Sequence, residues 1–222
     1  MFVAMGAEQR EAFLAALQNE HAEYNFDSII ASISKVDAGE AECRNKEDQE
    51  AILRELDQRV GIHECNKMVR GQLREAVCRE GKGALDAMAK EERATSVLIG
   101  NVGRLLQNMG ELEAARPLYE EALAGRRATL GDTHPGTLTS INNMGALLQA
   151  MGELEAARPL CEEALAGSRA TLGDTHPDTL GSINNMGGLL RAMGELEAAR
   201  PLYEEALAGR RATLGDTHPD TL

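Results

Sequence analysis

One thirty-residue sequence occurs three times in the second half of this chain. The stretch MGELEAARPLYEEALAGRRATLGDTHPGTL begins at Met109, a close variant begins at Met151, and residues 193–222 repeat the first copy with Asp220 in place of Gly136. The copies are spaced by 42 residues. A fixed period of that length is typical of a solenoid, in which each unit buries its apolar side only against its neighbours.

Each unit reads as two helices. The stretch DTHPGTLTSINNMGALLQAMG predicts a first helix, because Pro135 after His134 suits the first helical position and Gly152 suits the left-handed residue after a helix end. The stretch ELEAARPLCEEALAGSRATLG predicts a second helix that ends at Gly173. Its apolar face has three- and four-residue spacing and contains Leu154, Ala157, Cys161, Ala164 and Leu165. Only 3% of the chain is aromatic, and there is no Trp, so the composition favours helices over strands.

The repeated unit resembles the tetratricopeptide repeat, a helix–turn–helix motif of usually 34 residues. The matching positions are Met144, Gly145 and Leu148 in the first helix and Ala157, Cys161 and Ala164 in the second. Eight extra residues lie in the connector RATLGDTHPxTL, and this 42-residue variant resembles the kinesin light chain repeat. The resemblance covers roughly residues 95–222. It implies a right-handed α-solenoid and a non-catalytic interaction scaffold, with a cargo-adaptor role and a kinesin heavy chain among its partners.

Residues 1–94 do not follow this repeat but also read as helical. Asp27 caps a first apolar pattern in FDSIIASISKVDAG, and a second pattern, NKEDQEAILRELDQRVG, closes at Gly61. The stretch IHECNKMVRGQLREAVCREG predicts a third helix, and EGKGALDAMAKEERATSV bridges to the repeats. We therefore expect an all-α chain with a small helical N-terminal region (1–94), of unassigned role, and a repeat array (95–222). The array holds about three repeats and ends at the start of a fourth.

Charge and cysteine content exclude several classes of function. The net charge of −13 argues against nucleic acid as a partner, because binding phosphates requires a basic surface. No segment approaches the roughly 20 apolar residues of a membrane helix, and the apolar run in MFVAMGAEQR is too short for a signal peptide. The four cysteines form no CxxC pair. These features predict a cytoplasmic protein without a membrane or cofactor requirement.

The strongest candidate for catalysis or metal binding is the pattern Asp174, His176 and Asp178, which recurs near His134 and His218. A metal or acid–base role is one interpretation. The structural interpretation is favoured, since His-Pro opens a helix, an Asp near a helix start suits its dipole, and the pattern is present in every unit.

Two weaker signals also favour ordinary structural roles. The stretch REGKGAL, at Arg79–Leu85, lacks the first glycine of a phosphate-binding loop, and Gly83 stands where Ser or Thr should follow the lysine. His63, Cys65 and Cys78 have the wrong spacing for a zinc site. The sequence therefore predicts that the chain is not an enzyme and holds no metal.

The remaining candidate is the concave face, which the first helix of each pair lines in solenoids of this type. The predicted peptide-binding residues are Asn101, Arg104, Asn142, Asn143, Gln149, Asn184, Asn185 and Arg191. A primary amide carries donors and an acceptor, so it can pair with the backbone of an extended ligand, and the two arginines favour a partner segment with acidic residues. In the alternative interpretation, these asparagines only solvate the face or cap neighbouring turns.

Two further functions remain open from the sequence. The stretch DTHPDTL begins a fourth first helix, which leaves an apolar surface with Tyr203, Leu207 and Leu214 at the end of the third repeat. Self-association of a structural protein through this end is one alternative. The sensor arm of a larger regulatory ATPase is the other.

Overall fold

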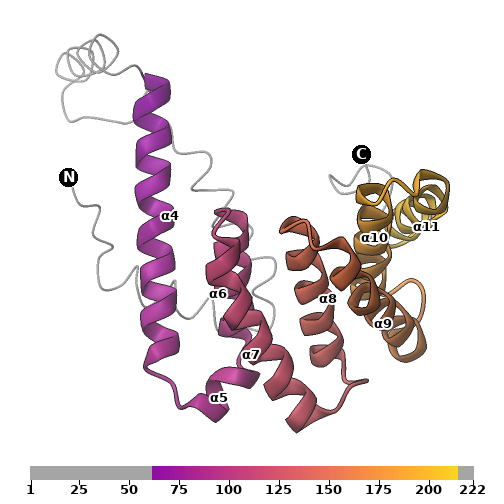
Figure 1. Cartoon of the computed structure of the whole chain (residues 1–222), viewed down its shortest axis with the longest axis horizontal. Coiled ribbons are helices and arrows are strands. Elements are labelled where there is room, and N and C mark those ends of the chain that lie inside the picture. The colour runs from indigo at the N-terminus through magenta and orange to yellow at the C-terminus, as the bar shows by residue number, and fades with distance from the viewer. Residues whose placement is uncertain (1–61, 215–222) are drawn as a thin grey trace. The chain divides into compact units, whose positions relative to one another are not determined.

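The computed structural model describes residues 62–214, and Figure 1 shows these as coloured ribbons. The chain divides into two compact units, Met1–Ala87 and Met88–Leu222. The helices predicted between residues 27 and 60, and the segment 215–222, lie outside the described residues. All elements of the described part are helices: α4 (Ile62–Asp86), α5 (Lys90–Thr95), α6 (Val97–Asn108), α7 (Leu112–Leu130), α8 (Pro135–Ala150), α9 (Leu154–Leu172), α10 (Pro177–Ala192) and α11 (Leu196–Leu214).

The repeats form consecutive antiparallel helix pairs, α6/α7, α8/α9 and α10/α11, which follow one another in chain order (Figure 1). Each second helix also packs against the first helix of the next pair, as α7 does on α8 and α9 on α10. The first helices contact one another as well, α6 with α8 and α8 with α10. We call α6, α8 and α10 the A row and α7, α9 and α11 the B row. This arrangement confirms the predicted α-solenoid.

The helix ends follow the sequence signals. His134 is the N-cap of α8, and its Nδ1 accepts a hydrogen bond from the backbone N–H of Gly136 at 3.1 Å. Pro135 takes the first helical position. Gly152 and Gly173 have φ of 80° and 85°, a left-handed conformation that L side chains disfavour. The predicted starts and stops of α8 and α9 are therefore confirmed.

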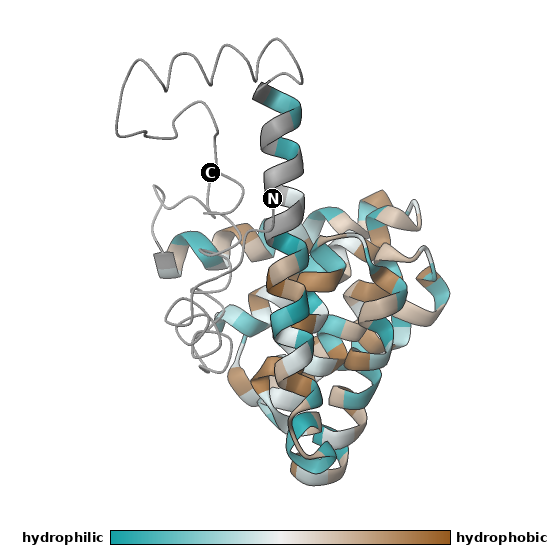
Figure 2. Ribbon diagram, turned by 90° about the vertical axis from the view of Figure 1, so that its left-hand side faces the viewer, coloured by the Kyte–Doolittle hydropathy of each residue, from teal (hydrophilic) through white to brown (hydrophobic). Residues whose placement is uncertain are grey.

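Small residues let the two helices of a pair approach closely. Ala157 and Ala164 are fully buried, and Cys161 is 1% exposed. A Cβ placed on Gly145 would lie only 2.8 Å from Cys161 Sγ. Leu123 of the preceding repeat packs against the same core. Apolar and polar residues alternate along the repeat helices (Figure 2), as expected when one side of each helix is buried.

The segment before the repeats differs from the sequence expectation. The third predicted helix of the N-terminal region, assigned to IHECNKMVRGQLREAVCREG, continues into the bridging stretch as far as Asp86, with Leu85 only 2% exposed. Gly81 does not adopt the left-handed conformation that ends a helix, which among described glycines occurs only in the connectors of the repeat array. The bridging stretch also contains the short helix α5.

Candidate functional site

The predicted peptide-binding residues all lie on the A row. Asn101 is buried, with 8% exposure, which leaves it little surface for a ligand. Arg191 is exposed. The remaining six are half-buried: Arg104, Asn142, Asn143, Gln149, Asn184 and Asn185. Because α8 contacts both α6 and α10, the row carries these side chains on adjacent helices.

In the first repeat, a tyrosine of the B row makes a hydrogen bond to an amide side chain of the A row. Tyr119 is 2% exposed, and its hydroxyl donates to Gln107 Oε1 at 3.2 Å. Burial raises the pKa of the phenol, although the nearby charge of Arg104 opposes that shift. The hydroxyl therefore stays protonated and holds Gln107 in place. Gly103 makes room for the ring, since a Cβ there would lie 2.7 Å from Tyr119 Cε1.

In the second repeat, the corresponding position is a cysteine. Burial raises the pKa of the Cys161 thiol to about 11, with a smaller contribution from the charge of Glu162. A protonated, buried thiol is a poor nucleophile, so this cysteine acts as a small core residue. Asn142, on the same repeat, has a buried Oδ1 without a hydrogen-bond partner among the described residues. A buried acceptor without a partner costs about 1–3 kcal/mol, so a ligand N–H there would relieve the penalty.

Three residues from different helices meet near the third repeat. A Cβ placed on Gly188 would lie 3.3 Å from Gln149 Nε2 and 3.6 Å from the Tyr203 hydroxyl. Gly188 therefore leaves the α10 backbone open between an amide from α8 and a phenol from α11. From the sequence, Tyr203 was expected on the apolar surface at the end of the third repeat and not at the candidate site. The difference between Tyr and Cys at one repeat position was the only signal that could have pointed to it.

The pattern with catalytic or metal-binding potential has structural roles. His176 Nδ1 accepts from the backbone N–H of Asp178 at 3.2 Å, so this histidine caps α10 as His134 caps α8. Asp174 pairs with Arg169 at 3.3 Å. Within the described part of the chain, no group of three His, Cys, Asp or Glu side chains could hold a metal ion. Gly81 and Gly83, from the phosphate-loop-like stretch, lie inside α4 rather than in a loop.

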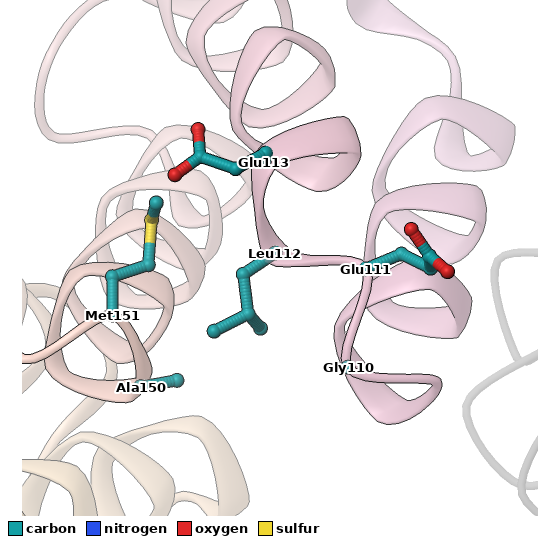
Figure 3. Close-up of a pocket in the computed structure, with 6 residues that line it drawn as sticks. All are labelled: Gly110, Glu111, Leu112, Glu113, Ala150 and Met151. Carbon is teal, nitrogen blue, oxygen red and sulfur yellow. The ribbon is translucent and has the colours of Figure 1, made fainter.

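The structure also shows a cleft that the sequence did not suggest. It has a volume of about 370 Å³ and is formed by the α6–α7 turn and the end of α8. Figure 3 shows Leu112 extending from that turn toward Ala150. The lining residues are Gly110, Glu111, Leu112, Glu113, Ala150 and Met151. This cleft therefore lies at helix ends and carries two carboxylates, unlike the amide-rich A row.

No helix within residues 62–214 has the length and apolar character needed to cross a membrane. Comparison with protein-family models matches tetratricopeptide repeats at residues 95–136 and, with a second model, at residues 137–212 and 180–222. No curated protein matches the sequence.

Among solved structures, the fold is similar to that of BtubC (BKLC) from P. vanneervenii, with a TM-score of 0.52 and 17% identity over 98% of this chain and 78% of that chain. It is also similar to the nearly identical TPR-like repeats of a Podosopora anserina putative kinesin light chain. That match has a TM-score of 0.53 and 22% identity, covering 93% of this chain and 95% of that one. A variant of the Podosopora protein gives a TM-score of 0.55 at 21% identity, covering 93% of this chain and 94% of that one.

The 42-residue period, the stacked helix pairs and the family matches agree with one another. The matched residues together span 95–222, which is more than half of the chain. This chain belongs to the tetratricopeptide repeat family.

Proposed function

We propose that this protein is a non-catalytic interaction scaffold that holds an extended segment of a partner protein along the A row. The observation that carries the proposal is the recurrence of half-buried asparagines on two adjacent helices, Asn142–Asn143 on α8 and Asn184–Asn185 on α10. Their amides offer donors and acceptors that suit a peptide backbone. The acceptor of Asn142 that has no partner within the described part supports the same role.

Charge supports an acidic partner segment. Arg104 and Arg191 lie on the first and last helices of the A row, in a chain with a net charge of −13. Cations at both ends of a row favour a ligand with Asp or Glu, and affinity should weaken as salt is added. A cargo-adaptor role, a kinesin heavy chain partner and a cytoplasmic location stay predictions, as does the alternative of a sensor arm in a regulatory ATPase.

The test is binding of the full chain to an array of acidic peptides, followed by titration of the best binder. Replacing both Asn143 and Asn185 with Ala should remove about 1 kcal/mol per lost hydrogen bond, and the circular dichroism melt should stay in place. Asn108→Ala, an exposed asparagine at the end of α6, is the control. Arg191→Glu should selectively weaken the binding of acidic peptides. Unchanged affinity in the double variant would defeat the proposal.

A second candidate function is self-association as a structural repeat protein. Leu123 and Leu165 pack against the cores of the repeats that follow them. Their counterpart in the third repeat, Leu207, is 37% exposed, and Leu196 on the same helix is 60% exposed. An apolar surface that packs against the next repeat within the array, and that is exposed at the described end, favours contact with another protein surface.

A further inference from the structure

Both repeat junctions in the described array have the same electrical polarity. Arg127 of α7 pairs with Glu163 of α9 at 2.7 Å, and the next pair, Arg169 with Glu205, measures 2.6 Å. In each case the arginine belongs to the earlier repeat and the glutamate to the later one. Each repeat therefore has a cationic trailing face, toward the next repeat, and an acidic leading face, toward the one before.

A second set of contacts follows the same rule. Arg116 donates to the carboxylate of Glu153 and, at 3.2 Å, to Met151 Sδ. Arg158 makes the same two contacts in the next repeat, to Glu195 and, at 3.1 Å, to Met193 Sδ. The repetition shows, residue by residue, what covers a trailing face in this protein. The cover is the leading face of another repeat of the same kind.

The trailing face of α11 repeats these groups without a described repeat after it. Arg200 occupies the position of Arg116 and Arg158, is exposed, and has no ion pair to a described residue. Leu207 occupies the position of Leu123, which is half-buried and packs against the core of the next repeat, and Leu207 is 37% exposed. Two such faces would oppose arginine to arginine, so a symmetric contact between them is electrostatically unfavourable. A surface that complements this trailing face therefore carries glutamates.

The first repeat has such a leading face, and α5 covers part of it. Glu111, the counterpart of Glu153, is exposed and lines the 370 Å³ cleft. Glu121, the counterpart of Glu163, accepts from Arg93 of α5 at 2.8 and 2.5 Å. Arg93 thus takes the place that an arginine of a preceding repeat would hold. α5 has six residues and none of them is buried, and besides the ion pair it packs on α7 through Ala94, where a Cβ placed on Gly125 would lie 2.4 Å from the Ala94 Cβ.

We propose that a second copy of this chain docks head to tail, with its leading face on the trailing face of α11. In this contact, Arg200 of one copy meets Glu111 of the next, and α5 is a displaceable cover that restrains the association. The inference rests on the second candidate function and specifies its orientation, its contacts and its restraint. A head-to-tail contact of this kind is heterologous, so it adds further copies in one direction.

The test is sedimentation velocity of the full chain over a wide concentration range. Arg200→Glu and Glu111→Arg should each weaken association by about tenfold or more. An equal mixture of the two variants should restore it, because each unlike contact is then a charge pair. Lys82→Glu and Glu75→Arg, exposed positions on α4 with the same charge changes, should leave association unchanged. If Arg200→Glu or Glu111→Arg changes the thermal unfolding curve, the milder variants Arg200→Gln and Glu111→Gln are used in their place.

The restraint is tested separately with Arg93→Ala, which removes the ion pair of α5 with Glu121. Association should then appear at a several-fold lower concentration. The inference would be overturned if the charge variants associated as strongly as the parent chain, or if mixing the two variants did not restore association. Either result would leave the more general proposal of self-association in place. A monomer at every concentration, with Arg93→Ala as well, would overturn both. The Asn143 and Asn185 variants report on peptide binding alone.

Discussion

Gly145 and Gly100 are both helical glycines on the A row, but they have opposite surroundings. A Cβ on Gly145 would meet Cys161 Sγ at 2.8 Å, whereas a Cβ on Gly100 would have no neighbour within 4 Å. The same amino acid is therefore needed for close packing at one site and is only a source of backbone freedom at the other.

Replacing each of these glycines with alanine should separate the two roles. Gly145→Ala should lower the free energy of unfolding by about 1–3 kcal/mol through overpacking, and Gly145→Val by more. Gly100→Ala should raise it by up to about 1 kcal/mol, because alanine favours the helix. Urea denaturation measures both. Equal stability of the two alanine variants would mean that α8 and α9 do not approach closely at Gly145.

Some residues of the candidate site could be predicted and others could not. The asparagines on the A row follow from the repeat pattern, because that pattern assigns positions to faces within one helix pair. The meeting of Gln149, Gly188 and Tyr203 depends on how α8, α10 and α11 stack across two repeats. No spacing within one unit encodes that geometry.

At the scale of elements, the helix ends of the repeats were predictable because Pro and Gly act locally at the caps. The extent of α4 was not, since Gly81 continues the helix although it could have ended it. The helix α5 was not predictable either, because none of its six residues is buried and it has no apolar periodicity. The ion pairs between helices of the B row also depend on stacking and could not be read from the sequence.

The Arg127–Glu163 pair should make a small, measurable contribution to the packing of α7 against α9. Both side chains are 38% exposed, so we expect a coupling energy of about 0.2–1 kcal/mol that declines with salt. The measurement is a double-mutant cycle with alanine at both positions, followed by urea denaturation. Arg169 and Glu205 provide a matched cycle with nearly the same geometry. Strictly additive effects in both cycles would exclude any coupling across these junctions.

At the scale of the whole molecule, the repeat array is a series of similar junctions, and the main helix–helix contacts among residues 97–214 join neighbouring repeats. The stability of such an array depends on the number of junctions more than on any single long-range contact. This property also explains why the fold of residues 95–214 could be predicted, since one correctly interpreted unit specifies the others.

Deleting residues 151–192, one full period, should give a shorter array that still folds. In the shortened chain, Gly145 faces Tyr203 as Gly103 faces Tyr119, and Gln149 can accept from the Tyr203 hydroxyl as Gln107 does from Tyr119. We expect retained helicity and a lower melting temperature, measured by circular dichroism, because one repeat and its junction are lost. A largely unfolded product would contradict this equivalence.

The interchangeable junctions have a consequence for inheritance. Repeats that are near-identical at the protein level can be encoded by near-identical segments, and such segments can misalign during recombination and gain or lose a whole period. Because Arg116 and Arg158 meet the same pair of groups, a methionine and a glutamate, such an event leaves the surviving side chains with suitable partners. The length of the array, and with it the reach of its amide-lined row, can therefore change in a single genetic step without a new fold having to be found.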